Sequence, residues 1–286
     1  MLDTVRDTGP VVVGVDDSDS ARDAALWAAD LATDWGAPLQ LTHVVNRPGS
    51  VSSSAPPQWL RELRDAAERA GAEQTSTAVR YGSPGDQLLA QAHDARLLVL
   101  GSYGEDGWSG MLVGSNALYL VGVSQCPLIV VRGSAPGIAP PRSGPVVVGV
   151  DGTASGAAAL RFAATVASKS QHRRLLAVHT WSDVVSDAGR PRRLDDSVDT
   201  LAARGAALLD RSLEPVLAEY PTLTVERQVL GDTPLRALLE HASDAWLVVV
   251  GQRRDLPGAG MLIGSTSRGL IEFASCPVAV VPPRDE

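Results

Sequence analysis

The sequence repeats itself. The segment Pro10–Asp16 reads PVVVGVD, and the same residues recur at Pro145–Asp151. Later segments of the two halves also match: Leu98–Gly101 with Val248–Gly251, Gly110–Ser115 with Gly260–Ser265, and Cys126-Pro127 with Cys276-Pro277. A chain that repeats on this scale holds two copies of one structural unit. The fold of the first half must therefore serve for the second half as well.

The two copies differ in length and are joined by a linker. The number of residues that separates a segment from its match in the second half is larger for the later matches than for the first. The second copy therefore carries about 15 extra residues between its first strand and its glycine loop. We expect these between Trp181 and Leu201. Gly133–Pro145 is rich in Pro, Gly and Ser, a composition typical of linkers. We therefore predict a first domain at 1–133, a linker at 134–144 and a second domain at 145–286.

Apolar runs alternate with amphipathic segments in each half. In the first half the runs predict strands at Val11–Val15, Leu39–Val45, Ser76–Tyr81, Leu97–Leu100 and Leu128–Val131. Several runs are apolar without interruption, as strands buried on both faces of a parallel sheet are. Strands that alternate with helices predict a doubly wound, Rossmann-like α/β domain with right-handed crossovers, present twice.

Helix signals lie between the strands. Ala24, Trp27, Ala28 and Leu31 fall at i, i+3, i+4 and i+7, so they form one apolar stripe on a helix. Two further helices are predicted to begin with an N-cap residue followed by proline, at Ser83-Pro84 and Thr233-Pro234.

Composition and charge exclude several classes of protein. The net charge of −8 argues against a broad nucleic-acid surface, which needs a basic face. No apolar run approaches the ~20 residues that cross a bilayer. Cys126 and Cys276 are expected to be buried free thiols, because two distant cysteines do not make a disulfide framework. Together with the lack of a signal peptide, this predicts a cytoplasmic protein.

A glycine-rich loop follows the fourth predicted strand of the first half. Gly101-Ser-Tyr-Gly104 is followed, after nine residues, by Gly114-Ser115 at the start of the next helix. Gly101 lets the chain turn, and Gly104 permits a positive φ or close approach of a ligand. Free N–H groups at a helix start and in a glycine loop attract anions. The loop suits a phosphate chain, although turn chemistry without a ligand explains the glycines equally well.

This pattern resembles the ATP-binding signature of the universal stress protein family. Val13–Asp16, the turn Gly82–Pro84 and the ending Cys126-Pro127 are similar to that family too. The resemblance covers nearly the whole chain twice, as in the tandem members from actinobacteria. It implies a sheet of order 3-2-1-4-5 in each half. Ligands bind such sheets at the carboxyl ends of the strands where the order reverses, and both Asp16 and the glycine loop fall there.

The resemblance also implies individual contacts to ATP. It places Val44 near the adenine edge and Asp16 at a ribose hydroxyl or a bound Mg²⁺. The competing interpretation is that Asp16 caps the following helix, a role it would share with Asp17, Ser18 and Ser20. Ser115 likewise suits either a helix cap or a phosphate. The remaining implied contacts of the first half are Gly14, Gly101, Ser102, Tyr103, Gly104, Gly107, Gly114, Ser115 and Asn116.

The second half departs from the signature. Arg254 stands where the first half has a glycine, and the loop Gly251–Pro257 contains a proline. The Arg254 side chain could block the anion site, or Arg253 or Arg254 could pair bidentately with phosphate oxygens. Both interpretations remain open. The candidate contacts of this half are Gly149, Asp151, Gly251, Arg254, Gly264, Ser265 and Thr266.

Catalytic motifs are lacking. The single lysine, Lys169, lies outside any glycine loop, so there is no Walker A loop, and no H-E-x-x-H, C-x-x-C or G-x-S-x-G occurs. His43 and His179 take matching positions, where a structural or pocket-lining role is expected. Without a positioned base, fast hydrolysis is not expected. We therefore expect an ATP-binding regulator with slow or no hydrolysis. A slow nucleotide hydrolase and a nucleotide-independent scaffold are the alternatives.

The last strand of each half predicts how the halves assemble. Leu128–Val131 and Val278–Val281 are short and apolar, and the order 3-2-1-4-5 leaves each at a sheet edge, which invites pairing. We expect these strands to pair within one chain around a pseudo-two-fold axis, and isolated halves to dimerise or aggregate. A homodimer of the whole chain and an unidentified protein partner are further expectations.

Overall fold

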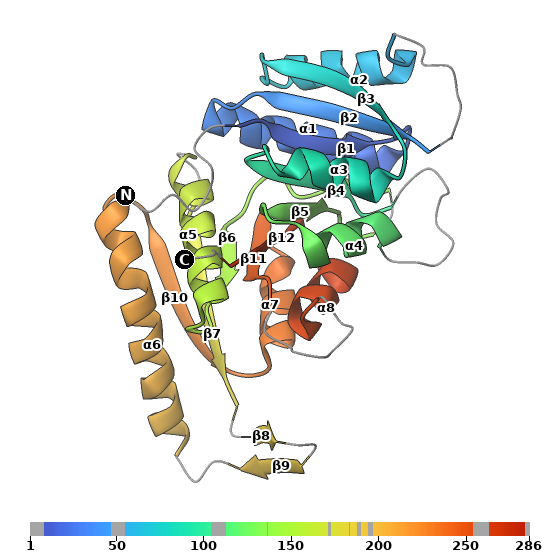
Figure 1. Ribbon diagram of the computed structural model, residues 1–286. Coiled ribbons are helices and arrows are strands. Elements are labelled where there is room, and N and C mark those ends of the chain that lie inside the picture. The colour runs from blue at the N-terminus through green and yellow to red at the C-terminus, as the bar shows by residue number, and fades with distance from the viewer. Residues whose placement is uncertain are drawn as a thin grey trace.

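The computed structural model describes residues 9–46, 55–103, 113–135, 137–170, 173–182, 184–187, 190–193, 197–253 and 263–283. Each half alternates strands and helices along the chain, as Figure 1 shows. The first half runs β1 Val11–Val15, α1 Asp19–Trp35, β2 Leu39–Val45, α2 Gln58–Arg69, β3 Thr75–Tyr81, α3 Pro84–Ala92, β4 Leu97–Gly101, α4 Ser115–Val123 and β5 Leu128–Val131.

The second half repeats this order and adds a small hairpin, β8–β9. It runs β6 Val146–Gly149, α5 Ala154–Ser168, β7 Leu175–Trp181, β8 Val184–Asp187, β9 Arg190–Arg193, α6 Val198–Glu219, β10 Val225–Gly231, α7 Pro234–Ala242, β11 Leu247–Gly251, α8 Ser265–Phe273 and β12 Val278–Val281.

Ten strands form one continuous sheet in the order β10-β7-β6-β11-β12-β5-β4-β1-β2-β3. Counted within its own half, each set of five strands has the order 3-2-1-4-5, and its neighbours are parallel. This confirms the predicted fold class for both halves.

The halves meet at the centre of the sheet, where β5 and β12 are antiparallel neighbours. Val130 lies opposite Val278, Ile129 opposite Ala279, and Leu128 opposite Val280. A two-fold axis perpendicular to the sheet makes identical edge strands antiparallel, as observed here. The predicted pairing within one chain is confirmed. Each half thereby loses its apolar edge.

Helix α1 illustrates how local signals produce these elements. Ser18 is its N-cap, and the Ser18 hydroxyl accepts a hydrogen bond from the Ala21 amide at 3.1 Å. Gly36 ends the helix in the left-handed region, with φ of 58°, which glycine adopts without steric cost. The predicted apolar stripe, including Trp27 and Leu31, is fully buried.

Helices α3 and α7 begin where the sequence predicts. Ser83 and Thr233 are the N-cap residues, and Pro84 and Pro234 follow as the first helical residues. Neither hydroxyl makes the capping hydrogen bond, however. The Ser-Pro and Thr-Pro pairs therefore predicted where each helix begins. They did not predict which groups accept hydrogen bonds from its first amides.

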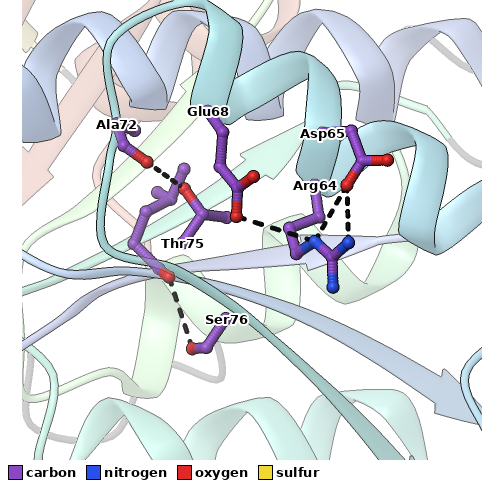
Figure 2. Close-up of polar contacts among 7 residues, drawn as sticks. Arg64, Asp65, Glu68, Ala72, Thr75 and Ser76 are labelled. Carbon is purple, nitrogen blue, oxygen red and sulfur yellow. Dashed lines mark hydrogen bonds and ion pairs between the residues drawn. The ribbon is translucent and has the colours of Figure 1, made fainter.

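Figure 2 shows polar contacts along α2 and in the turn that leads into β3. Arg64 on α2 pairs with Asp65 at 2.6 Å and with Glu68, one turn later, at 3.6 Å. The Thr75 hydroxyl donates to the Ala72 carbonyl at 2.5 Å, which closes the turn into β3. The Ser76 hydroxyl reaches the Leu39 carbonyl of β2 at 3.4 Å, so the edge strand is tied to its neighbour.

The extra residues of the second half lie between β7 and β10. Only part of them falls in the hairpin region that the sequence predicts, because α6 spans 22 residues where its counterpart α2 spans 12. The prediction that the whole insertion lies between Trp181 and Leu201 is therefore wrong. Among the described residues no helix, α6 included, is long and apolar enough to span a membrane.

The helices cover the sheet on both faces. Helices α1, α2, α5 and α6 share one apolar core with one face of the strands, and α3, α4, α7 and α8 share the other (Figure 1). Each core runs through both halves of the chain. The two halves are therefore joined by packing on both faces as well as by the β5–β12 hydrogen bonds.

An aromatic cluster joins the halves on the α1–α5 face. Trp27 on α1 stacks on Trp246, which precedes β11, with ring centroids 4.5 Å apart. The guanidinium of Arg173 lies 3.7 Å from the Trp246 ring centre and also pairs with Asp34 on α1. Both tryptophans are fully buried. Such aromatic and cation–π contacts add to the burial of apolar area.

We predict that Trp246→Ala lowers the free energy of unfolding by about 3–5 kcal/mol, because it leaves a large cavity at the junction of the halves. Urea denaturation measures this change. The matched control is Ile138→Ala, at a position that is 53% exposed, with an expected change within about 0.5 kcal/mol. A loss below about 1 kcal/mol for Trp246→Ala would mean that the cluster is not a main contact between the halves.

Candidate functional site

The candidate site of the first half lies at the carboxyl ends of β1 and β4. In the sheet β1 lies between β2 and β4, so Gly14 has Thr42 on one side and Leu100 on the other. The chain leaves β1 toward α1 on one face and leaves β4 toward α4 on the other face. Doubly wound sheets bind ligands in a crevice at such a divergence, so the crevice position of this half lies here.

The aspartates after the first strand of each half order the turn into the next helix. Asp16 accepts hydrogen bonds from the Ser18 amide at 3.2 Å and the Ser18 hydroxyl at 2.5 Å. Asp151 holds Thr153 in the same way, at 3.0 Å and 2.7 Å. Ser18 and Thr153 are the N-caps, so of the four candidates for the cap of α1 Ser18 is confirmed, and Asp16 is not the cap. Its carboxylate is instead held in a fixed orientation at the edge of the crevice.

Several site glycines are required by packing inside the protein. A Cβ on Gly14 would lie 2.6 Å from a methyl of Leu100 and 2.9 Å from one of Leu88. A Cβ on Gly149 would lie 3.1 Å from Leu238. Glycine at these positions lets α3 and α7 approach the sheet, which is a reason independent of any ligand.

Gly101 and its counterpart Gly251 bring the first turn of a helix against the end of a strand. A Cβ on Gly101 would lie 2.8 Å from the backbone carbonyl of Ser20 on α1. A Cβ on Gly251 would lie 2.7 Å from the backbone of Ser155 on α5. Their φ angles are not positive. The sequence-based explanation, a turn that needs glycine, is therefore replaced by close packing of helix on strand.

Gly114 and Gly264 differ from these glycines. Each is the N-cap of the following helix, with extended backbone. Among the described residues, a Cβ on Gly114 would meet only the Ser102 carbonyl, at 3.8 Å, and the nearest atom to a Cβ on Gly264 would be the Cβ of Arg253, at 3.5 Å. Packing among the described residues therefore leaves room for a side chain at both positions.

The first turn of α4 is not capped by a side chain. The Gly114 amide donates to the Ser102 carbonyl at 2.7 Å, and Ser115 and Asn116 follow as the first helical residues. The interpretation of Ser115 as the N-cap is wrong, since Gly114 holds that place. Helix α8 starts in the same way at Gly264, Ser265 and Thr266. In contrast, α1 and α5 have hydroxyl caps. The start of α4 thus offers amides to an outside acceptor.

The remaining predicted residues of the first site lie around this crevice, or outside the described part of the chain. Val44 is half-buried near the end of β2 and packs on the core shared by α3 and α4. Ser102 is buried. The Tyr103 amide donates to the Ser20 hydroxyl at 3.4 Å, and its phenol oxygen accepts from Gly137 in the linker at 3.3 Å. Gly104, Gly107 and Arg254 lie outside the described residues.

The two matching histidines connect strand ends. His43 Nδ1 lies 3.0 Å from the Val15 carbonyl, and His179 Nδ1 lies 2.7 Å from the Val150 carbonyl. The ring of Trp59 packs edge-on against His43. These contacts give both histidines a structural role at the rim of the crevice, as the sequence indicates.

Burial shifts the pKa values of two side chains near the junction of the halves. Cys126 and Cys276 are buried free thiols, as predicted. Burial raises the pKa of the Cys276 thiol to about 12, so it stays protonated at neutral pH and is not a nucleophile. Burial also lowers the pKa of the Arg132 guanidinium. Among the described residues no group of three His, Cys, Asp or Glu side chains is placed to hold a metal ion.

Two polar residues that the sequence did not single out lie at the same junction. Gln252 takes the place that Ser102 has in the first half, and it is only 2% exposed. Its side-chain amide donates to the carbonyls of Val121 and Gly122 on α4. Arg132 donates to the Ile271 carbonyl on α8 at 2.6 Å. Comparison of the repeats shows that Ser102 and Gln252 differ, but it does not show what Gln252 contacts.

Comparisons with known proteins agree with this architecture. The model of the universal stress protein family matches residues 8–132 and again residues 143–282. The universal stress protein Rv2623 of Mycobacterium tuberculosis is 32% identical, with 94% of this chain and 95% of that protein covered. A universal stress protein of Mycolicibacterium smegmatis is 31% identical, with coverage of 96% and 97%.

A solved structure shows the same fold over the full length. The universal stress protein from Archaeoglobus fulgidus superimposes with a TM-score of 0.63 at 18% identity, covering 96% of this chain and 97% of that chain. The repeated strand order, the two matches to the family model and the full-length relatives lead to one conclusion. The chain belongs to the universal stress protein family and carries two of its domains in tandem.

Proposed function

We propose that this chain binds ATP in its first half and acts as a nucleotide-dependent regulator in the stress response, with slow or no hydrolysis. One observation carries the proposal. Helix α4 begins at the reversal of strand order with a glycine that no contact among the described residues requires, and its N-cap makes no side-chain hydrogen bond. An anion at this helix start would explain both features, because it would accept the first-turn amides and approach the backbone closely.

The neighbouring residues fit the other parts of a nucleotide. The half-buried Val44 supplies an apolar surface for an adenine edge. The oriented carboxylate of Asp16 suits a ribose hydroxyl or a Mg²⁺ ion that accompanies the phosphates. The amides of Ser115 and Asn116 suit phosphate oxygens. Gly104 and Gly107, in the loop outside the described residues, would complete the cradle.

The groups around the crevice favour binding over catalysis. Hydrolysis needs a base that can reach the attacking water. His43, on the neighbouring strand, has its Nδ1 engaged by the Val15 carbonyl. A bound nucleotide would then act through its presence, by changing which surfaces the protein offers to a partner. Phosphate release slower than about 1 s⁻¹ is the expected result of a turnover assay.

We predict that Gly114→Val weakens ATP binding roughly 10- to 100-fold, because the added side chain keeps phosphate away from the α4 amides. Isothermal titration calorimetry measures the affinity, with cyclic AMP as a competitor to define the preferred nucleotide. The matched control is Gly264→Val, the same change at the start of α8. The control should leave the stronger site unaltered. Both variants should fold, since neither Cβ comes closer than 3.5 Å to its neighbours in the described part of the chain. Equal affinity of wild type and Gly114→Val would contradict the proposal.

We also predict that the two halves bind nucleotide unequally. Arg254 replaces a loop glycine, and Gln252 replaces Ser102 beside it, so the second site is built differently. Calorimetry should show one strong site per chain, with the second weaker or empty, and Gly114→Val should weaken the strong one. Two equal and independent sites would overturn this prediction. Mass spectrometry of nucleotide released from freshly purified, denatured protein gives the stoichiometry independently.

A further inference from the structure

Gln252 connects the two halves at one end of helix α4. It follows Gly251 at the carboxyl end of β11, where the glycine loop of the second half begins. Its backbone amide donates to the Val281 carbonyl of β12 at 2.7 Å, which fixes its main chain. Its side-chain nitrogen donates to the Val121 carbonyl at 2.7 Å and to the Gly122 carbonyl at 2.9 Å. A residue of the second half thus holds a helix of the first.

The two carbonyls that Gln252 contacts belong to the last turn of α4. The last carbonyls of a helix have no partner within the helix and need other donors. The Ser124 amide satisfies the Leu120 carbonyl at 2.8 Å, and Gln252 satisfies the next two. Because Gln252 is almost fully buried, water cannot easily take over if its side chain is removed.

Helix α8 is held at the equivalent place by a different residue. Arg132, which directly follows β5, donates to the Ile271 carbonyl, the counterpart of the Val121 carbonyl. The two helices therefore share one arrangement. Each begins at the candidate site of its own half and has its last turn held by a side chain from the other half. Only the contact to α4 starts from a glycine loop, because Gln252 follows Gly251.

We propose that Gln252 is a positioning residue for the nucleotide site of the first half, acting through the last turn of α4. This inference rests on the function proposed above. Helix α4 has nine residues and a length of about 13 Å, short enough to move as a rigid body. A shift at its last turn would therefore move the amides of Ser115 and Asn116 that are proposed to meet phosphate.

The test uses the full chain and two substitutions at one position. Gln252→Met keeps the length of the side chain but removes the donor. Gln252→Ser introduces the residue that the first half has at this place. Both should weaken ATP binding by about fivefold or more in calorimetry. The matched control, Arg173→Met, breaks a contact between the halves on the opposite face of the sheet and should keep the affinity within about twofold.

Amide hydrogen exchange of the ligand-free protein provides a second readout. Both Gln252 variants should speed exchange in α4, whereas α3 of the same half serves as the internal reference and should not change. Wild-type ATP affinity in both Gln252 variants overturns the inference, and so does an equal loss in Arg173→Met. If the wild type binds no ATP, the proposed function fails on its own. In that case the amide exchange rate of α4 decides whether Gln252 positions the helix. An exchange rate in the Gln252 variants equal to that of the wild type overturns this positioning role.

Discussion

The antiparallel pairing of β5 with β12 is the contact on which the rest of the molecule depends. Each strand has four residues, and all of them are buried. Left unpaired, each would be an apolar sheet edge and a template for aggregation. Paired, they turn two five-stranded sheets into one of ten strands and give both halves a common core on each face. The same pairing brings α4 and α8 within reach of side chains from the opposite half.

The side chains at this junction show that the two repeats have become complementary rather than identical. Trp27 is the ninth residue of α1, and Phe162 is the ninth residue of α5. Arg96 precedes β4, and Trp246 precedes β11. Trp27 stacks on Trp246, whereas Phe162 packs edge-on against Trp35, over which Arg96 lies. If two copies of the same half were paired, these side chains would meet different partners. The packing therefore favours association of the first half with the second.

The glycines of the candidate site show how one residue type serves two purposes. Gly14 and Gly101 are required because leucine side chains or the backbone of α1 occupy the space of a Cβ. Gly114 has no such neighbour among the described residues. The sequence pattern treats all of these as one signature. The folded structure separates the glycines that packing needs from the glycine best explained by a ligand, because the distinction depends on atoms brought in from distant segments.

The repeat, the strands, the helix starts and the order 3-2-1-4-5 could be predicted from the amino-acid sequence, because they follow from local periodicity, capping chemistry and a recognisable signature. The sequence also indicated the pairing of Leu128–Val131 with Val278–Val281, since both are apolar edges. Three features could not be predicted: Ser18 rather than Asp16 caps α1, much of the insertion lengthens α6, and Gln252 caps the last turn of α4. The choice between Ser18 and Asp16 is a local one that neighbouring polar side chains leave open. The contact of Gln252 with α4 joins residues more than a hundred positions apart, and such a contact leaves no periodic mark in the chain.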